Sequence, residues 1–480
     1  MTGRVTADPC LISDLQSAFH PKAVAVVGVS RDDVNPPPGY TGLRIFRQFR
    51  EEGFEGRLYP INPRATVIDD VPAFPSISAV PERLDLVIIT IPARGVPQVL
   101  EDCIANGAVN VHICTAGFGE TGEAEGKAIE DRVREIVRRG HLRVVGPNSM
   151  GYHVPASRMK MYAGVQLTAG PVAFVSQSGG HAQNFTGHGP ALGIGFSKVI
   201  SYGNALAMDG TDFLEYLAGD PETRIICVYL EGVKDGHRLV QLARDIGRTK
   251  PLIVWKGGLT DFGARAAVTH TASIAGDDRL WRAFFRQTGA VQVGSIEEMA
   301  DAAMTFLRLK PISRSRVAVI GGGGGGNVAT GDICAQEGVS VPPLAGETRR
   351  SLLSLLPPVN QSIVNPIDGP AALYNPALLG EVLGALTASP DLDAVVLHVA
   401  TALNLVTTAE SRALLKSCIS GFGARGSGKP VVVAVEGLER TPADVEDIVR
   451  EMRDAGITTY SSLRAACRSL KRVADYYSFQ

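Results

Sequence analysis

The sequence predicts an α/β protein built from parallel, doubly wound sheets in three successive blocks. Buried, β-branched runs alternate with helical patterns along the chain, which is the order expected when helices cover both faces of a parallel sheet. Glycine (53 residues) and proline (29 residues) are abundant without any repeat, as many tight turns between strands and helices require. With 480 residues and a hydrophobic content of 45%, the chain can fill the cores of two to four domains.

The first block, residues 15–155, begins with a buried run at residues 23–27 and a glycine turn at Gly28. Further strands are predicted at residues 58–62, 86–91, 109–113 and 144–146. Helical patterns lie between the strands, for example at residues 41–52 and 122–139. This alternation of strands and helices indicates one doubly wound domain.

The second and third blocks repeat the pattern in residues 165–309 and 315–478. Strands of the second block are predicted at residues 172–176, 197–201, 225–230 and 252–255, with a closing helix at 296–309. Residues 310–315 break the pattern and are typical of a linker. The third block has strands at 316–320, 394–398 and 430–435, the glycine run Gly321–Gly326, and a last helix at 461–477. The glycine run lacks the Lys-Ser/Thr of a P-loop, so we interpret it as a permissive turn.

Composition narrows the class of protein. The chain has 47 Lys and Arg against 49 Asp and Glu, which argues against a nucleic-acid-binding or membrane-surface protein. Its seven cysteines are an odd number without a CxxC pair, so we expect neither a disulfide framework nor a metal site. The N-terminus has no apolar signal region and no stretch reaches membrane-spanning length. We therefore expect a soluble cytoplasmic protein.

His270 is the first candidate catalytic residue. It follows the predicted strand 252–255 in a loop of small residues, where an imidazole can swing freely. A neutral imidazole is a good nucleophile toward phosphorus, although a lone histidine is more often a hydrogen-bonded loop residue. Glu231, at the end of the strand 225–230, could hold a histidine N–H and fix its tautomer, or be a solvated strand end.

A short polar loop is the second candidate. It follows the strand 172–176 and comprises Ser176, Gln177, Ser178, Gly179 and Gly180. Backbone N–H groups at the start of the next helix and two hydroxyls form a cradle for an anion. The alternative is a helix capped by serine, which is among the preferred N-cap residues.

The loops of the first block predict a ligand cleft. The turn Gly28–Ser30 could hold a phosphate at a helix start, with Arg31 pairing a second one. Loops at 91–92, 116–122 and 146–151 also follow strands, so they fall on the same carboxyl edge. There is no full G-x-G-x-x-G and no acidic residue placed for a ribose, which disfavours a nicotinamide-dependent oxidoreductase.

Taken in order, these stretches resemble the NDP-forming acyl-CoA synthetases, relatives of the succinyl-CoA ligase α subunit. The resemblance extends from about residue 15 to about residue 475. The matching stretches are residues 21–31, 59–63, 116–122, 146–148, 176–179, 201–204, 229–231, 269–271 and 365–368. It implies a Rossmann-like CoA-binding domain followed by two flavodoxin-like domains of the succinyl-CoA ligase type.

The resemblance also implies a reaction. An acid, CoA and ATP are interconverted with acyl-CoA, ADP and phosphate through an acyl phosphate and a phosphohistidine. His270 carries the phosphoryl group, Glu231 holds His270, and the loop Ser176–Gly180 receives the phosphate. The implied CoA contacts are Gly28, Ser30, Arg31, Asn62, Pro92, Gly117, Glu120, Pro147 and Asn148.

Three departures from the family pattern bear on these expectations. Thr269-His270-Thr271-Ala272 replaces the frequent Ser-His-Thr-Gly, and residues 34–38 make the first loop longer and richer in proline. No ATP-grasp domain is found in the sequence. We therefore expect an oligomer in which a separate ATP-grasp β-type subunit holds ATP or ADP with Mg. The identity of the carboxylic acid stays open. The alternative function is a CoA-binding or acyl-CoA-binding protein without ligase activity.

Overall fold

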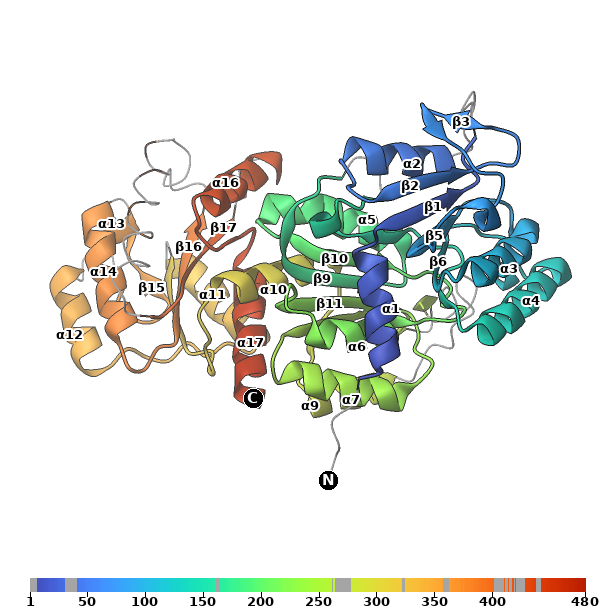
Figure 1. Cartoon of the computed structure of the whole chain (residues 1–480). Coiled ribbons are helices and arrows are strands. Elements are labelled where there is room, and N and C mark those ends of the chain that lie inside the picture. Colours follow the sequence, from blue (N-terminus) through green and yellow to red (C-terminus); the bar gives the residue numbers. More distant parts are fainter. Residues whose placement is uncertain are drawn as a thin grey trace. The chain divides into compact units, whose positions relative to one another are not determined.

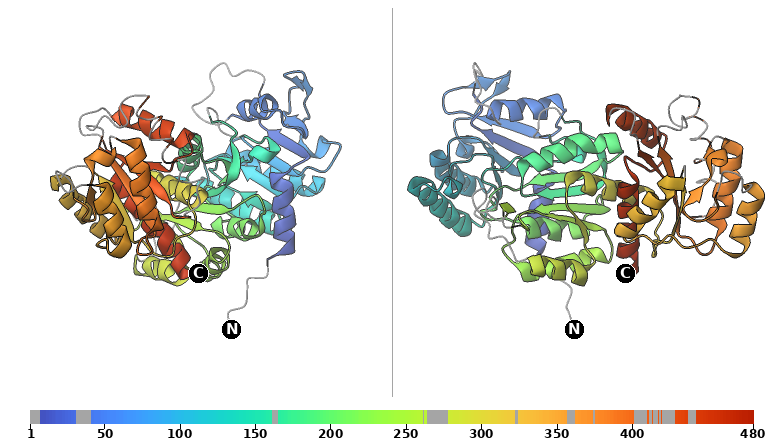
Figure 2. Two further views of the ribbon diagram at one scale, coloured as in Figure 1. Left: turned by 90° about the vertical axis from the view of Figure 1, so that its left-hand side faces the viewer. Right: turned by 180° about the vertical axis from the view of Figure 1, so that it is seen from behind.

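The computed structural model describes residues 7–30, 41–160, 165–260, 262–263, 278–321, 324–356, 362–373, 375–400, 410, 413, 417, 419, 428–436 and 442–480. The chain forms two compact units (Figures 1 and 2). Unit 1 contains Met1–Pro190 and Ile194–Ile296, and unit 2 contains Ala191–Gly193 and Glu297–Gln480. Within the described ranges, no helix is long and apolar enough to cross a membrane.

The first sheet of unit 1 is parallel throughout, with the order β2-β1-β5-β6-β7. Its strands are β1 (Ala23–Val27), β2 (Arg57–Ile61), β5 (Leu86–Ile89), β6 (Asn110–Ile113) and β7 (Arg143–Val145), and a small hairpin joins β3 (Val67–Ile68) to β4 (Val71–Pro72). Strands β1, β5 and β6 are buried at every position because helices cover both faces of the sheet.

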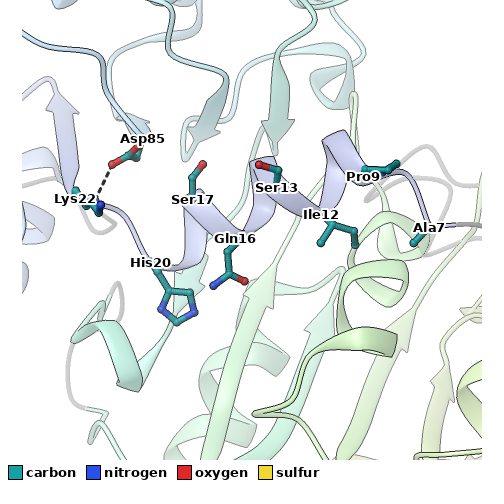
Figure 3. A pocket seen from close by; sticks show the side chains of 9 residues that line it. All are labelled: Ala7, Pro9, Ile12, Ser13, Gln16, Ser17, His20, Lys22 and Asp85. Atoms are coloured by element: carbon teal, nitrogen blue, oxygen red, sulfur yellow. Dashed lines mark hydrogen bonds between the residues drawn. The ribbon is translucent and has the colours of Figure 1, made fainter.

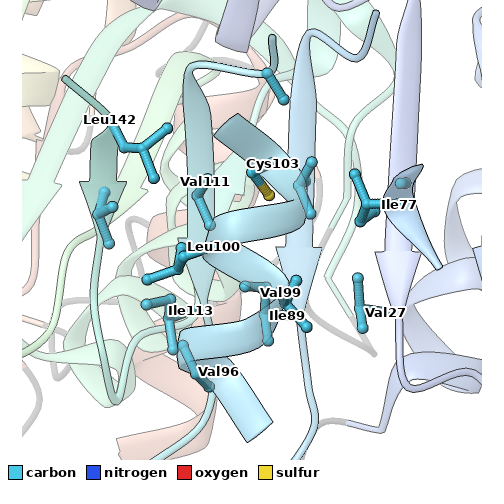
Figure 4. Close-up of a cluster of buried hydrophobic side chains, with 14 of the residues drawn as sticks. Val27, Ile77, Ile89, Val96, Val99, Leu100, Cys103, Val111, Ile113 and Leu142 are labelled. Carbon is cyan, nitrogen blue, oxygen red and sulfur yellow. The ribbon is translucent and has the colours of Figure 1, made fainter. Parts of the chain in front are cut away.

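The helices that cover this sheet begin and end at recognisable signals. They are α1 (Pro9–Phe19), α2 (Gly42–Glu51), α3 (Val96–Asn106) and α4 (Ala124–Gly140). The Thr41 hydroxyl caps α2, and α3 ends at Gly107, whose φ of 79° suits glycine. Helices α3 and α4 pack on one face of the sheet, where Leu100 and Cys103 meet strand residues in a fully buried cluster (Figure 4).

The second sheet of unit 1 has the order β13-β12-β11-β9-β10-β8. Its strands are β8 (Gly151–His153), β9 (Ala169–Ser176), β10 (Phe196–Ser201), β11 (Ile225–Leu230), β12 (Leu252–Lys256) and β13 (Val291–Val293). The helices are α5 (Gly179–His188), α6 (Gly210–Gly219), α7 (Gly236–Gly247) and α9 (Asp278–Thr288). All strand pairs are parallel except β8 with β10, which is antiparallel.

Unit 2 contains the third sheet, with the order β15-β14-β16-β17-β18. Its strands are β14 (Val317–Gly321), β15 (Ile367–Asp368), β16 (Ala394–Ala400), β17 (Val431–Glu436) and β18 (Thr459–Tyr460). The helices are α10 (Ile296–Arg308), α11 (Gly324–Gln336), α12 (Gly346–Leu355), α13 (Pro370–Leu373), α14 (Pro376–Ala388), α16 (Pro442–Asp454) and α17 (Leu463–Phe479).

The three large sheets share one strand order. Numbered within each sheet along the chain, the parallel strands follow 2-1-3-4-5, which is the flavodoxin-like order, and β8 is added beside β10. The crossovers diverge between strands 1 and 3. These switch points lie between β1 and β5, between β9 and β11, and between β14 and β16. Ligands of such sheets bind outside the carboxyl ends of the strands at this point.

Helix α1 connects the first two sheets of unit 1. The Asn110 side chain of β6 donates to the Asp14 carbonyl over 2.9 Å, and the Tyr216 hydroxyl of α6 donates to Gln16 Oε1 over 2.5 Å. A groove of about 710 Å³ follows the helix. In Figure 3, Ser13 and Ser17 point to one side of α1, and Ile12, Gln16 and His20 point to the other. Helix α1 is therefore hydrogen-bonded both to a strand of the first sheet and to a helix of the second.

The predicted α/β class is confirmed, and each predicted strand has a counterpart in the structure. The sequence analysis did not include α1 or the short strands β8, β13, β15 and β18, which have only two or three residues each. An antiparallel β8 also departs from the expected parallel sheet. The glycine run is more than a turn, because Gly321 ends β14 and Gly324 begins α11. Helix α10, predicted to close the second block, has almost all its residues in unit 2.

Candidate functional site

The turn after β1 needs glycine. Gly28 has a φ of +97°, and a Cβ atom there would lie 2.8 Å from both Ile91 Cγ2 and Thr90 Oγ1. The Asn62 side chain, after β2, donates to the Val29 carbonyl over 2.6 Å. The loops after β1, β2 and β5 are thus held together at the switch point of the first sheet.

The loop after β7 closes the other end of this edge. Gly146 and Pro147 are joined by a cis peptide bond, and the Asn148 N–H donates to the Thr115 carbonyl over 2.8 Å. The Asn204 N–H, which follows β10 of the second sheet, donates to the Pro147 carbonyl over 3.0 Å. A Cβ atom at Gly203 would lie 2.4 Å from the Pro147 and Asn148 carbonyl oxygens. The carboxyl edges of the two sheets therefore meet here.

Glu120 organises the loop after β6. Its carboxylate accepts hydrogen bonds from the Gly117 N–H over 2.6 Å and from the Phe118 N–H over 3.2 Å. It also accepts from Asn204 Nδ2 over 2.9 Å. A direct CoA contact of this carboxylate stays a prediction, because the structure shows it bound to the protein itself.

Most of the predicted CoA residues come together along this carboxyl edge. Those in described positions are Gly28, Ser30, Asn62, Pro92, Gly117, Glu120, Pro147 and Asn148, and Arg31 lies outside the described residues. Ser30, Pro92 and Asn148 are exposed, whereas Pro147 is buried and serves packing. Exposed polar groups beside glycine turns suit an elongated polar ligand such as CoA, since a chain without Cβ atoms permits close approach.

At the switch point of the second sheet, the predicted anion cradle is also a capped helix. The Ser178 hydroxyl accepts from the His181 N–H over 3.3 Å and so caps α5. The Ser176 side chain is fully buried, and its hydroxyl donates to the Ser178 carbonyl over 2.7 Å. The first N–H groups of α5 belong to Gly179 and Gly180, where the positive end of the helix dipole favours an anion.

Gln177 serves a purpose that the sequence did not indicate. Its side chain is buried, and its Oε1 accepts from the Glu231 N–H over 2.9 Å and from the Gly232 N–H over 3.2 Å. The Tyr202 hydroxyl donates to the same oxygen over 3.4 Å. This side chain therefore connects the cradle to the residues that follow β11, and a phosphate contact by it stays a prediction.

Glu231 lies directly after β11, beside the cradle, and is only 7% exposed. The Tyr229 hydroxyl donates to its Oε1 over 3.3 Å. Burial raises the pKa of Tyr229, and the Glu231 charge raises it further. Burial lowers the pKa of Lys256, at the end of the adjacent β12, while the Glu231 charge partly offsets this. Glu231 is thus a buried carboxyl side chain at the strand end and not the solvated residue of the alternative interpretation.

His181 is a neighbour of the cradle that the sequence analysis missed. Its ring centroid lies 4.6 Å from that of Tyr229 and 4.6 Å from that of Trp255. The available signal was its place in the first turn after the Ser178 cap. Asn204 was missed as well, although it stood in one of the matching stretches.

The predicted nucleophile His270 lies outside the described residues, as does Ala272. The described elements on either side of this segment are β12 and α9. Leu230 pairs with Lys256 across β11 and β12, so the strand that leads toward His270 ends beside Glu231.

Comparisons with known proteins agree with this architecture. The model of a CoA binding domain matches residues 22–155, and that of a succinyl-CoA ligase like flavodoxin domain matches residues 169–306. A solved structure, dinucleotide forming acetyl-coenzyme A synthetase 1 of Ca. Korarchaeum cryptofilum in complex with phosphate and ADP, matches with a TM-score of 0.83. It is 29% identical in sequence, and the match covers 96% of this chain and 97% of that chain.

Curated relatives resemble the chain over nearly its whole length. The acetate–CoA ligase [ADP-forming] I subunit alpha of Pyrococcus furiosus is 33% identical over 95% of this chain and 96% of the relative. The acetate–CoA ligase [ADP-forming] I of Archaeoglobus fulgidus is also 33% identical, and the match covers 96% of this chain but only 64% of that longer protein. The chain therefore belongs to the family of ADP-forming acid–CoA ligases, the NDP-forming acyl-CoA synthetases.

Proposed function

We propose that this chain is the α-type catalytic subunit of an ADP-forming acid–CoA ligase. The complete enzyme interconverts a carboxylic acid, CoA and ATP with acyl-CoA, ADP and phosphate. The observation that carries the proposal is the buried Glu231, whose backbone N–H is bound by Gln177 of the loop that begins α5, in the same unit as the edge suited to CoA. The Pyrococcus relative, named as an α subunit, supports it over the same span.

The work is divided among three domains, residues 15–155, 165–309 and 315–478. CoA is held at the carboxyl edge of the first sheet, with Ser30, Asn62 and Asn148 as its polar contacts. The second domain carries the phosphoryl transfer. Its loop Ser176–Gly180 and Glu231 stand at the carboxyl ends of the neighbouring strands β9 and β11.

In the proposed transfer step, His270 attacks the phosphorus of an acyl phosphate. A P–N bond forms, the P–O bond to the acyl group breaks, and the carboxylate leaves. Glu231 accepts a hydrogen bond from the other imidazole N–H and offsets the positive charge that the ring gains. The N–H groups of Gly179 and Gly180 and the dipole of α5 stabilise the phosphoryl oxygens.

The nucleotide step is assigned to a separate ATP-grasp β-type subunit that holds ADP or ATP with Mg. The α-subunit name of the Pyrococcus relative supports a separate chain, whereas the longer Archaeoglobus relative carries the activity named for it on a single chain. Acetate is the acid named for both relatives.

Labelling with phosphate tests the proposal. The purified chain is incubated with acetyl-CoA and ³²P-phosphate, and should gain one acid-labile, base-stable phosphoryl group without any partner. His270→Ala should abolish the label while CoA still binds in calorimetric titration. Transfer of the label to ADP should require the partner subunit. A wild-type chain that binds CoA but takes up no label from acetyl-CoA or from a panel of longer aliphatic and aromatic acyl-CoAs would instead be a CoA-binding protein without ligase activity. Label that persists in His270→Ala would exclude the assigned nucleophile.

A further inference from the structure

Gln177 connects two loops at the switch point of the second sheet. It follows β9, and its own N–H donates to the Tyr229 carbonyl of β11 over 3.2 Å. Its side chain is only 5% exposed and accepts from the N–H groups of Glu231 and Gly232, over 2.9 and 3.2 Å. The main chain and side chain of Gln177 thus bind three of the four residues from Tyr229 to Gly232 at the end of β11.

The hydrogen-bond donors determine which end of the amide faces β11. Both partners are backbone N–H groups, which can only donate, so the atom between them must be the acceptor Oε1. The Tyr202 hydroxyl, after β10, donates to the same oxygen over 3.4 Å. A single amide oxygen therefore receives donors from the loops that follow two different strands.

This arrangement supplies a hydrogen-bond acceptor for backbone N–H groups at the end of β11. A backbone N–H that leaves a sheet in a buried place must find another acceptor, because an unsatisfied one costs free energy. The Gln177 oxygen supplies that acceptor for two successive residues. The backbone of Glu231 is consequently tied to the same short loop that carries Ser178 and begins α5.

We propose that Gln177 is a positioning residue that fixes the Glu231 carboxylate relative to the N-terminus of α5. This inference rests on the proposed function, and gives Gln177 a role different from a phosphate contact. If the carboxylate must meet an imidazole while the helix N-terminus meets its phosphoryl group, the distance between the two has to be constant. The buried side chain of Gln177 keeps that distance constant.

The charged surroundings of Glu231 make the pH profile an informative measurement. The described ionisable side chains that interact with this carboxylate are Tyr229, Tyr202 and Lys256. The two tyrosines are neutral at working pH, because burial raises the pKa of each. Histidines titrate in the range of pH 5 to 8, and the His181 imidazole beside Tyr229 is common to all variants. The informative quantity is therefore the difference in pH midpoint between a variant and the wild type.

The experiment compares three variants of the full chain in labelling by acetyl [³²P]phosphate. Gln177→Met keeps the length but removes the acceptor, and should slow labelling roughly 10–100-fold, the usual effect of losing a residue that orients a reacting group. The pH midpoint of labelling should also fall, because an imidazole without a well-placed carboxylate protonates less readily. Gln177→Glu keeps an acceptor oxygen and should recover much of the rate.

Asn110→Leu is the matched control for stability. Asn110 is a buried amide of β6 that donates to the Asp14 carbonyl over 2.9 Å and to the Asp85 carbonyl over 3.0 Å, at the end of the first sheet away from the site. This variant should lose thermal stability as Gln177→Met does, but its pH midpoint should match that of the wild type.

The outcomes separate the two levels of the argument. If the wild-type chain takes no label, the proposed function fails and the inference about Gln177 falls with it. If the wild type is labelled but Gln177→Met shows the wild-type midpoint and rate per folded molecule, only the positioning role is overturned. A midpoint shift in Asn110→Leu equal to that of Gln177→Met would also overturn it.

Discussion

The first and second sheets of unit 1 have the same strand order but differ in what lies at their switch points. At the first, between β1 and β5, the loops are shaped by glycine and by amide side chains such as Asn62. At the second, between β9 and β11, the buried polar side chains Gln177 and Glu231 approach the start of a helix.

Under the proposed function, one topology serves binding at the first switch point and chemistry at the second. A surface for a long ligand gains from turns without side chains, because the backbone and small polar groups can approach the ligand closely. Phosphoryl transfer needs charges and dipoles at fixed places, which a buried and well-supported carboxyl group and a helix N-terminus provide together. Substitutions at either switch point should therefore affect one activity and leave the other unchanged.

The largest effect is expected for Gly28→Ala. The new Cβ would lie 2.8 Å from Ile91 Cγ2 and Thr90 Oγ1 at a φ of +97°, so backbone strain and overpacking together should cost about 2–5 kcal/mol. CoA affinity, measured by calorimetry, should fall at least tenfold, while labelling by acetyl phosphate persists. Gly122→Ala is the control, because its φ of +75° is strained but no atom lies within 4 Å. Equal effects of both substitutions would contradict the steric argument.

A buried histidine in each sheet of unit 1, His112 in β6 and His153 in β8, should make stability fall in acid, and His112 supports the first sheet. Burial lowers the pKa of His112, in β6, to about 4 from an ordinary value of 6.5. The unfolded chain takes up this proton first, so stability present above pH 6.5 is lost as pH falls toward 4. The loss should reach about 3 kcal/mol. The free energy of unfolding, measured by urea denaturation at several pH values in this range, should fall less steeply with decreasing pH in His112→Gln than in the wild type. The same pH dependence in both proteins would disprove the assignment.

Glu231→Gln should slow labelling and leave CoA binding unchanged, which is the opposite of the result expected for Gly28→Ala. Gln can still accept a hydrogen bond but carries no charge, so losing a charge-assisted bond should cost about 1.5–3 kcal/mol. Labelling by acetyl phosphate should slow about 10–100-fold, whereas the Kd for CoA stays within a factor of two. A fully active variant would show that the carboxylate serves only the strand end.

Asn204→Ala should have the smallest effect and should sharpen the boundary between the two edges. The Asn204 side chain donates to Glu120 Oε2 over 2.9 Å, and removing it should cost about 0.5–1.5 kcal/mol. The KM for CoA should rise a few-fold because the Gly117 loop loses support, with labelling by acetyl phosphate unchanged. A change confined to labelling would place Asn204 with the second switch point instead.

The long strands and their order along the chain could be predicted from the sequence. Runs such as residues 225–230 and 172–176 are buried on both faces, and continuous apolar stretches carry that signal. Strands of two or three residues show little periodicity, so β8 and β15 were not predicted, although the three-residue β7 was. Helix α1 was not predicted. Its role depends on contacts with residues about 200 positions later, such as the one between Gln16 and Tyr216, which a local sequence pattern does not indicate.

The candidate site was predicted in its parts but not in its connections. Glu231 and the cradle were found because each stands at a strand end. The role of Gln177 depends on how the ends of β9 and β11 lie beside each other. The register between the two strands determines this, and the register cannot be read from the sequence pattern. Likewise, nothing in the sequence indicates that the Glu120 carboxylate is bound by the N–H groups of its own loop.

Helix α1 has a consequence for how the chain is made. Its Gln16 accepts from Tyr216, 200 positions later, and its Leu11, Leu15 and Phe19 are buried in the finished fold. At roughly 5–20 residues per second, a ribosome needs about 10–40 s to synthesise that interval. Throughout this time one side of α1 lacks its partner. The first sheet can thus form early, but helix α1 makes its last contacts only after the residues of the second sheet that bind it have been synthesised.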